Sequence, residues 1–360
     1  MKKVLVPCLA LLLLACSGKN QLAVDALVDA GLLEIAVAEV KTETTTPEPL
    51  DFRVMTFNCG TTNQVLHKGQ GGYTAEHGDL IDASYRNNLA WAPAEEALRQ
   101  FIAAHQPQVV VLQEVYYDGW CETDDLELPS GLDMVCDGYD KDAPLQIRRL
   151  LGDQYHAACA WHFADLCVGV RKDFGQLAAC QDEVCIDALP GTPVDGCSSS
   201  ARVARAEITL VAGGELTVVA VHTNAGMSYD DQECRGKQFA QVFEDSGDGA
   251  PAASGTANVA MGDMNTDPFA FVGADSSLDV WNKYVGEGKP FHYISADSYE
   301  DPVTHVTFMH LDHVISDSVI GECLVHGESP GTQPVMDSSF FDHRPVVCDV
   351  TLPQDGGVLE

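Results

Sequence analysis

The 360-residue sequence is poor in basic residues: 20 lysines and arginines stand against 54 aspartates and glutamates, for a formal net charge of −34. A field of that sign repels polyanions, so the composition weighs against tight binding of duplex DNA unless bound cations or a basic patch reverse it. A nuclease is not excluded, because divalent metal ions could supply positive charge. The acidity is also typical of a protein outside the cytoplasm that gains solubility from its charge.

Long apolar runs are also missing beyond the N-terminus. Met1, Lys2 and Lys3 precede a short apolar run over residues 4–14, and this pattern indicates an export signal rather than a membrane-spanning helix. The following Leu-Leu-Ala-Cys resembles the lipobox of bacterial lipoproteins, which implies lipidation of Cys16; ordinary secretion is the alternative. We therefore expect an exported cell-envelope lipoprotein, in the outer membrane or on the cell surface, held to the membrane by acyl chains alone.

The chain divides by composition into four segments. The signal peptide is predicted over residues 1–16, and a Thr- and Pro-containing tether over 17–50. Residues 51–353 contain no second linker of that kind and are long enough to bury one substantial core, which favours a single domain followed by a short tail over 354–360.

The cysteines predict disulfides. Removal of Cys8 with the signal and use of Cys16 for lipid leave 11 of the 13 cysteines, an odd number. Connectivity cannot be deduced from sequence, but proximity suggests three pairs: Cys121 with Cys136, Cys180 with Cys185, and Cys323 with Cys348. Zinc binding by the cysteines is the alternative, and it is disfavoured because the sequence lacks paired Cys-x-x-Cys motifs.

Apolar runs of strand length alternate with helical patterns. Helices are expected over 93–105, over 145–151, after Asp230, and briefly from Asp267 and Pro268. The runs 202–211 and 216–221 flank two glycines and predict a hairpin, and thus antiparallel pairing within a mixed sheet. Further strands are expected at 52–57, 109–112, 166–170, 257–261, 311–315 and 345–352. The mixture favours an α/β (α+β) fold with two packed sheets and helices outside.

Short polar motifs lie at the ends of these strands, where α/β folds assemble their sites. They contain Asn58; Glu114; His222 and Asn224; Asp263 and Asn265; Asp312 and His313; and Asp342 and His343. Any one of them alone is a weak signal, because Asp and Asn also form ordinary turns. The sequence shows no P-loop and no Gly-x-Ser-x-Gly motif, so direct attack by water is preferred over a covalent serine route.

Taken in order from Phe52 to Leu352, the motifs resemble those of the endonuclease/exonuclease/phosphatase superfamily of metal-dependent phosphoesterases. The resemblance implies a four-layer sandwich of two mixed β-sheets flanked by helices. It also implies a Mg²⁺ cofactor, with Mn²⁺ or Ca²⁺ as alternatives, because hard cations suit oxygen ligands. Glu114 would be the main metal ligand and Asn58 would lie beside the metal. Asp342 would ligate or orient a second site.

The resemblance also implies roles in hydrolysis. Asp263 would orient or deprotonate the attacking water, and Asn265, two residues along the same extended segment, would hold a phosphoryl oxygen. His343 would contact the scissile phosphate with Asp312 behind it, fixing the tautomer of the ring. His222 would act as general acid for the leaving oxygen.

Two further residues are candidate phosphate ligands. Asn224 lies in an Asn-Ala-Gly run similar to that of abasic-site nucleases, whereas His222 is typical of the deoxyribonuclease and sphingomyelinase branches, so the subfamily stays open. Arg171 ends a predicted strand from which a cation could reach phosphate; a structural ion pair is the alternative.

The expected function is hydrolysis of a phosphodiester, either a phospholipid headgroup or another small diester. An extracellular nuclease is the first alternative, and a non-catalytic surface binding module is the second. The expected partners are the phosphodiester substrate and, through the lipid anchor, the membrane. No stable protein partner is predicted.

Overall fold

A computed structural model of the chain describes residues 48–60, 83–122, 131–245, 249–336 and 340–353. The predicted signal peptide with Cys16, most of the tether and the predicted C-terminal tail lie outside the described residues. None of the helices in the described ranges is long and apolar enough to cross a membrane.

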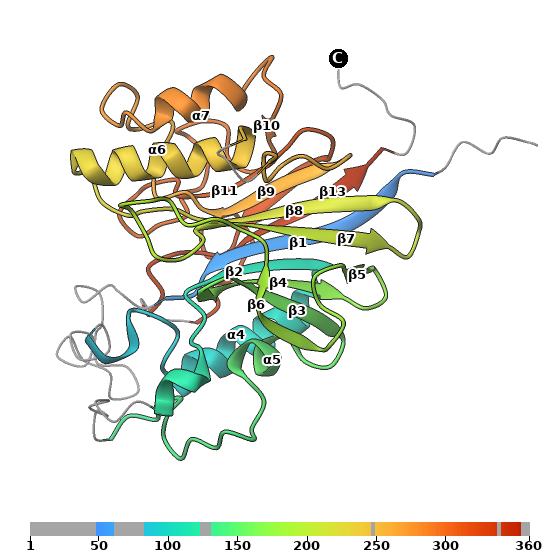
Figure 1. The fold of residues 1–360 in the computed structure, drawn as a ribbon, viewed down its shortest axis with the longest axis vertical. Coiled ribbons are helices and arrows are strands. Elements are labelled where there is room, and N and C mark those ends of the chain that lie inside the picture. The colour runs from blue at the N-terminus through green and yellow to red at the C-terminus, as the bar shows by residue number, and fades with distance from the viewer. Residues whose placement is uncertain (1–47, 61–82, 123–130, 246–248, 337–339, 354–360) are drawn as a thin grey trace, which may run out of the picture. The chain divides into compact units, whose positions relative to one another are not determined.

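Two mixed β-sheets form the centre of the described unit (Figure 1). The first has seven strands in the order β12 (Ile320–Val325), β13 (Val346–Leu352), β1 (Leu50–Asn58), β2 (Val109–Gln113), β4 (Phe163–Arg171), β3 (Tyr155–Ala160) and β6 (Val184–Leu189). The second has six, in the order β10 (His292–Tyr293), β11 (Asp312–Ser316), β9 (Asn258–Asp263), β8 (Glu215–His222), β7 (Val203–Leu210) and β5 (Gly175–Leu177).

Alternation along each strand sends side chains into different layers. In β1, Phe52 and Val54 lie in the core between the two sheets, whereas Met55 and Phe57 lie in the core on the outer face of the first sheet. This is the period of two expected of a strand buried on both faces. The same holds for β8 in the second sheet, whose Val218 and Val219 belong to different cores.

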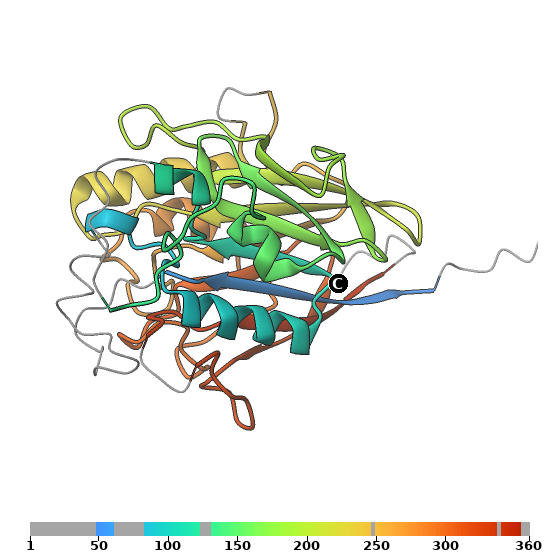
Figure 2. The ribbon, with the colours of Figure 1, turned by 90° about the horizontal axis from the view of Figure 1, so that it is seen from below.

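Helices cover the outer faces and complete the four layers. On the first sheet lie α4 (Ala92–His105) and α5 (Gln146–Leu151), beside the short 3-10 helix η2 (Asp118–Glu122); on the second lie α6 (Tyr229–Phe243) and α7 (Leu278–Tyr284). Figures 1 and 2 both show α4 against the first sheet. Leu98, Phe101 and Ile102 form its buried stripe. The predicted sandwich of two mixed sheets flanked by helices is confirmed.

Five disulfides are present among the described residues, and a single described cysteine, Cys59, is free and buried. The three pairs suggested by proximity are confirmed, and two more join Cys159 to Cys167 and Cys197 to Cys234. Such a number of disulfides is typical of an extracellular or periplasmic protein, which folds in an oxidising environment.

One predicted helix was wrong. Asp267 and Pro268 do not open a helix; the Asp267 carboxylate accepts hydrogen bonds from the backbone N–H groups of Phe269 and Ala270, and α7 begins only at Leu278. The carboxylate satisfies the free amides at the start of a single turn, and another of its bonds, from the backbone N–H of His310, ties that turn to the chain before β11. These local hydrogen bonds therefore stabilise a single turn at Asp267 instead of a helix.

Candidate active site

Strand directions bring the predicted site residues to one edge of both sheets. In the first sheet β1 and β2 are parallel, with Asn58 opposite Gln113, so Asn58 and Glu114 emerge together. In the second, β8 and β9 are parallel, with His222 opposite Asp263. The strands β11 and β13 run antiparallel to these and therefore begin at the same edge, where Asp312 pairs with Asp263.

Hydrogen bonds link the two sheets through Asn58. Its Nδ2 donates to Glu114 Oε1 at 3.0 Å and to Asp263 Oδ2 at 3.1 Å, while its Oδ1 accepts from the backbone N–H of Gly60 at 3.0 Å. A side chain at Gly60 would occupy the space of the Glu114 carboxylate, because a Cβ there would lie 1.6 Å from Glu114 Oε2. Glycine at position 60 therefore leaves room for this carboxylate.

Asp263 is buried and is held by several donors. Its Oδ1 accepts from the backbone N–H of Asn265 at 2.8 Å, and its Oδ2 accepts from the Asn265 side-chain amide at 3.1 Å. Asn265 has a left-handed backbone (φ 48°), which turns its amide back toward Asp263 and toward the carbonyl of Thr223. Burial raises the pKa of Asp263, and the neighbouring His343 opposes that rise.

His343 and Asp312 form a buried pair. The Nδ1–H of His343 donates to Asp312 Oδ2 at 2.7 Å, which leaves Nε2 directed toward Asp263 Oδ2, 3.7 Å away. Burial on its own lowers the pKa of His343, but Asp312 and Asp263 outweigh it and hold the pKa well above its ordinary value. His343 is therefore protonated at neutral pH and carries a proton on Nε2.

The pKa of His222 is shifted in the opposite direction from that of His343. Its Nε2 lies 3.5 Å from Glu114 Oε1 and 3.8 Å from Asp263 Oδ2. Burial, with the positive charge of Arg202 added, lowers its pKa well below the ordinary value. The ring is therefore neutral, so it can donate a hydrogen bond but holds no excess proton, which does not favour the general-acid role predicted from the sequence.

The carboxylates of this group repel one another. The pKa of Glu114 is raised to about 8, first by burial and then by the charge of Asp342. Buried like charges at this density need a compensating cation, and the donor set of carboxylate and amide oxygens is the one that hard divalent ions prefer. Glu114, Asn58 and Asp342 thus fit a metal ion of the Mg²⁺ class.

Asn224 is held by hydrogen bonds from two side chains of helix α6. Gln238 Nε2 donates to Asn224 Oδ1 at 2.8 Å, and Gln238 Oε1 accepts from the Asn224 backbone N–H at 2.8 Å. Arg235, fully buried and paired with Asp275 at 2.6 Å, donates to the carbonyl of Asn224 at 2.8 Å. The loop after β8 is therefore fixed by buried polar bonds from the helix that covers its sheet.

Arg171 does not join the group, so its predicted phosphate contact is corrected. Strand β4 is antiparallel to β2, with Val170 opposite Val109, and Arg171 therefore lies at the far edge of the sheet. Its guanidinium contacts Asp173 Oδ1 at 2.5 Å and donates to the Gln106 carbonyl at 2.8 Å. The direction of β4 was not readable from its composition, which is why a strand-end arginine was misplaced.

Two residues at this edge were missed. Arg202 lies just before β7, and its backbone carbonyl accepts a hydrogen bond from the backbone N–H of His222 at 2.9 Å. Its guanidinium stacks on Phe163, with Cζ 4.2 Å from the ring centroid. Its Nε is buried and has no hydrogen-bond partner among the described residues. His305 lies beside His343, with ring centroids 4.6 Å apart. Neither carries a motif; only strand pairing reveals them.

Comparisons with known proteins find structural similarity alone. No family model matches the sequence, and no curated protein is similar to it. Among solved structures, an endonuclease/exonuclease/phosphatase from Bacteroides vulgatus is 16% identical with a TM-score of 0.48, over 84% of this chain and 99% of that one. The human Nocturnin catalytic domain with bound sulfate is 15% identical with a TM-score of 0.47, over 84% and 93%.

A third similar structure is ANGEL2, a 2',3'-cyclic phosphatase in complex with adenosine-2',3'-vanadate. It is 14% identical with a TM-score of 0.48, over 85% of this chain and 96% of that one. These low identities and TM-scores carry no conclusion about function, which has to be inferred from the side chains at the shared edge of the two sheets.

Proposed function

We propose that the chain is a divalent-metal-dependent phosphoesterase of the endonuclease/exonuclease/phosphatase type, which hydrolyses a phosphodiester by attack of activated water. The observation that carries this proposal is that His343 Nε2 lies 3.7 Å from Oδ2 of the Asp263 carboxylate, beside the half-buried carboxylate of Glu114. Hydrolysis of a phosphodiester needs a proton acceptor, a proton donor and compensation of negative charge; this edge has side chains for the first two and oxygen ligands for a metal ion that would supply the third.

The metal would be held by Glu114, Asn58 and Asp342. When bound, a Mg²⁺ ion, or Mn²⁺ or Ca²⁺ in its place, would supply positive charge to neutralise the phosphate. The oxygen donors suit such an ion, and a cation removes the repulsion that raises the pKa of Glu114.

The protein's own groups would move the protons. Asp263 accepts a proton from the attacking water, and the amides of Asn58 and Asn265, both donating to Oδ2, fix the direction of its carboxylate. The Nε2–H of His343 donates to a non-bridging or leaving oxygen of the phosphate, and Asp312 holds the ring in place. Neutral His222, which lies opposite Asp263 on the neighbouring strand β8, would donate a hydrogen bond to the phosphate.

Arg202 takes the role first predicted for Arg171. Among the described residues it forms no ion pair, although the negative charge of Asp165 acts on it, and its Nε has no hydrogen-bond partner there. Its guanidinium shares the ring of Phe163 with His222, whose centroid lies 5.6 Å from that ring. A substrate phosphate is the anion that this half-buried guanidinium would bind. Asn224 would donate a further hydrogen bond to a phosphate oxygen. Both side-chain hydrogens of Asn265 are bonded, to Thr223 and to Asp263, so it would orient Asp263 rather than hold the phosphate.

Arg202→Gln is expected to lower kcat/KM for a phosphodiester by about 10- to 100-fold, because a hydrogen bond to a charged group contributes roughly 1.5–3 kcal/mol. Arg171→Gln is the matched control and should leave kcat/KM near that of the wild type. Steady-state kinetics of both variants check this, and equal losses in the two would contradict the assignment of Arg202.

Substrate class follows from charge. We favour a phospholipid headgroup or another small diester over nucleic acid, because the net charge of −34 opposes a polyanion at most of the surface. A lipid anchor at Cys16 would hold the enzyme at the outer membrane or cell surface. An extracellular nuclease is the alternative, and a binding module without catalysis is the second.

A panel with metal removal tests the proposal. Purified protein is incubated with bis(p-nitrophenyl) phosphate, sphingomyelin vesicles, RNA and plasmid DNA, each with Mg²⁺ or with EDTA. We expect hydrolysis of at least one diester with Mg²⁺, its loss in EDTA, and recovery when Mg²⁺ is restored. Undiminished activity after chelation would refute metal dependence, and no hydrolysis of any substrate would favour the binding module.

A further inference from the structure

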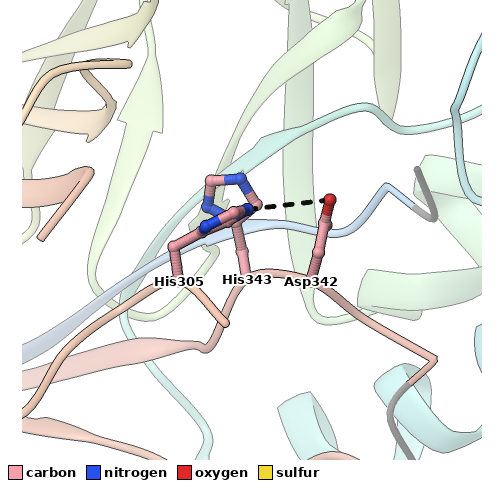
Figure 3. A group of neighbouring side chains, drawn as sticks. All are labelled: His305, Asp342 and His343. Carbon is pink, nitrogen blue, oxygen red and sulfur yellow. Dashed lines mark ion pairs between the residues drawn. The ribbon is translucent and has the colours of Figure 1, made fainter. Parts of the chain in front are cut away.

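A histidine-rich cluster lies beside the proposed catalytic pair (Figure 3). It consists of His305, Asp342 and His343, which each offer one ligand atom, and these atoms all lie within 4.8 Å of one another. His305 Nε2 lies 3.8 Å from Asp342 Oδ2. Of the three, His305 belongs to no motif and is not used in the proposed hydrolysis.

The backbone holds the cluster in place. Residues 304–306 pair with residues 342–344 in a short antiparallel contact: His305 bridges His343, the Val306 N–H donates to the Asp342 carbonyl at 2.9 Å, and the Arg344 N–H donates to the Thr304 carbonyl at 2.8 Å. The histidines therefore do not depend on a flexible loop to meet. A site whose ligands are fixed before binding pays little ordering entropy.

Each histidine presents one nitrogen, Nε2, and has the other occupied. His305 Nδ1 contacts Thr307 Oγ1 at 2.6 Å and the Thr307 backbone N–H at 3.2 Å, and His343 Nδ1 is bonded to Asp312. With zinc on Nε2, His305 would carry its proton on Nδ1 and donate it to Thr307 Oγ1. Hydroxyl and carboxylate partners of this kind orient the imidazole rings of metal-binding histidines. The His305 side chain is 13% exposed, so the cluster lies near the surface of the protein.

The donor set selects a different ion from the one that Glu114 and Asn58 would hold. Two imidazole nitrogens and one carboxylate suit Zn²⁺, whereas Mg²⁺ prefers oxygen alone. A zinc ion about 2.1 Å from each ligand fits the separation between His305 Nε2 and Asp342 Oδ2.

We propose that His305, Asp342 and His343 form a second cation site for Zn²⁺, and that its occupation inhibits the enzyme. This inhibition rests on the proposed function. Zinc bound at Nε2 of His343 would occupy the atom proposed to contact the phosphate, and the same ion would engage Asp342, one of the carboxylates assigned to the Mg²⁺ group. One ion would thereby block both a phosphate contact and a metal ligand.

The test separates binding from activity. The affinity of the full chain for Zn²⁺ is measured by isothermal titration in saturating Mg²⁺, for the wild type, His305→Ala and His305→Gln, with His156→Ala as a control on strand β3. We expect both His305 variants to bind zinc at least about tenfold more weakly than the wild type, and the control to bind it with unchanged affinity. Equal zinc affinity in all four proteins would overturn the site, whatever the enzyme hydrolyses.

Inhibition is then measured with the diester that the substrate panel identifies. Zinc should inhibit the wild type and His156→Ala at the concentration at which it binds, and should inhibit the His305 variants only at about tenfold higher concentration or above. Their activity in Mg²⁺ alone should match that of the wild type, and circular dichroism shows whether they fold. Zinc binding that depends on His305 but leaves activity unchanged would overturn the inhibitory role.

Discussion

Asp263→Asn is expected to lower kcat for phosphodiester hydrolysis by about 10²- to 10⁴-fold, the range over which a positioned base contributes to proton transfer. An amide has nearly the same shape as the carboxylate but accepts no proton from water. Asp263 is buried and receives donors from Asn58 and Asn265, so water or another acid cannot easily take its place. Steady-state kinetics in saturating Mg²⁺ measure the loss.

The control for Asp263 is an aspartate at the far edge of the first sheet. Asp349 pairs with Arg53 at 2.7 Å on the exposed surface, and Asp349→Asn should leave kcat unchanged. Thermal unfolding of both variants shows whether a loss comes from the fold. A folded Asp263→Asn protein with near wild-type kcat would rule out Asp263 as the proton acceptor.

His343→Ala should lower kcat by a similar factor of about 10²- to 10⁴-fold, because it removes the group that holds a proton at neutral pH. Asp312→Asn should cause a large part of the same loss without touching the phosphate, because Asp312 keeps Nδ1 bonded and raises the pKa of the ring. Kinetics of the two single variants and the double variant test this link.

Groups that act as a unit give effects that do not add. The double variant Asp312→Asn/His343→Ala is therefore expected to be no slower than His343→Ala alone. If the two losses multiply instead, Asp312 has a role that does not pass through His343, and the pair is not the unit described above. A matched exchange of the neighbouring His305 to alanine reports any general effect of removing an imidazole from this edge.

The fold and the meeting of the main residues could be predicted from the sequence because both follow from short-range patterns. Strands such as 109–112 and 216–221 are marked by apolar runs, and a polar residue after each run lies at a strand end. Once β1 and β2 are parallel, Asn58 and Glu114 share an edge of the first sheet, and His222 and Asp263 share an edge of the second in the same way.

What the sequence could not supply was strand direction and electrostatic state. Arg171 and Arg202 both flank strands, but only pairing with β2 and β8 shows which edge each occupies. His222 and His343 are chemically identical in sequence; burial beside Arg202 makes one neutral, and burial beside Asp312 makes the other cationic. His305 reaches the site only through an isolated bridge between two segments that lack regular structure.

The proposed catalytic edge is shared between two sheets that meet through their side chains, by packing in the core and by the hydrogen bond from Asn58 to Asp263. Asn58 and Glu114 belong to the first sheet, Asp263 and Asp312 to the second, and the core between them contains residues such as Val54 and Val218. Neither sheet alone contains both the proton acceptor and the metal group. The rate of hydrolysis would therefore depend on the relative position of the two sheets. A core substitution that shifts one sheet against the other would abolish activity while leaving the hydrogen bonds within each sheet intact.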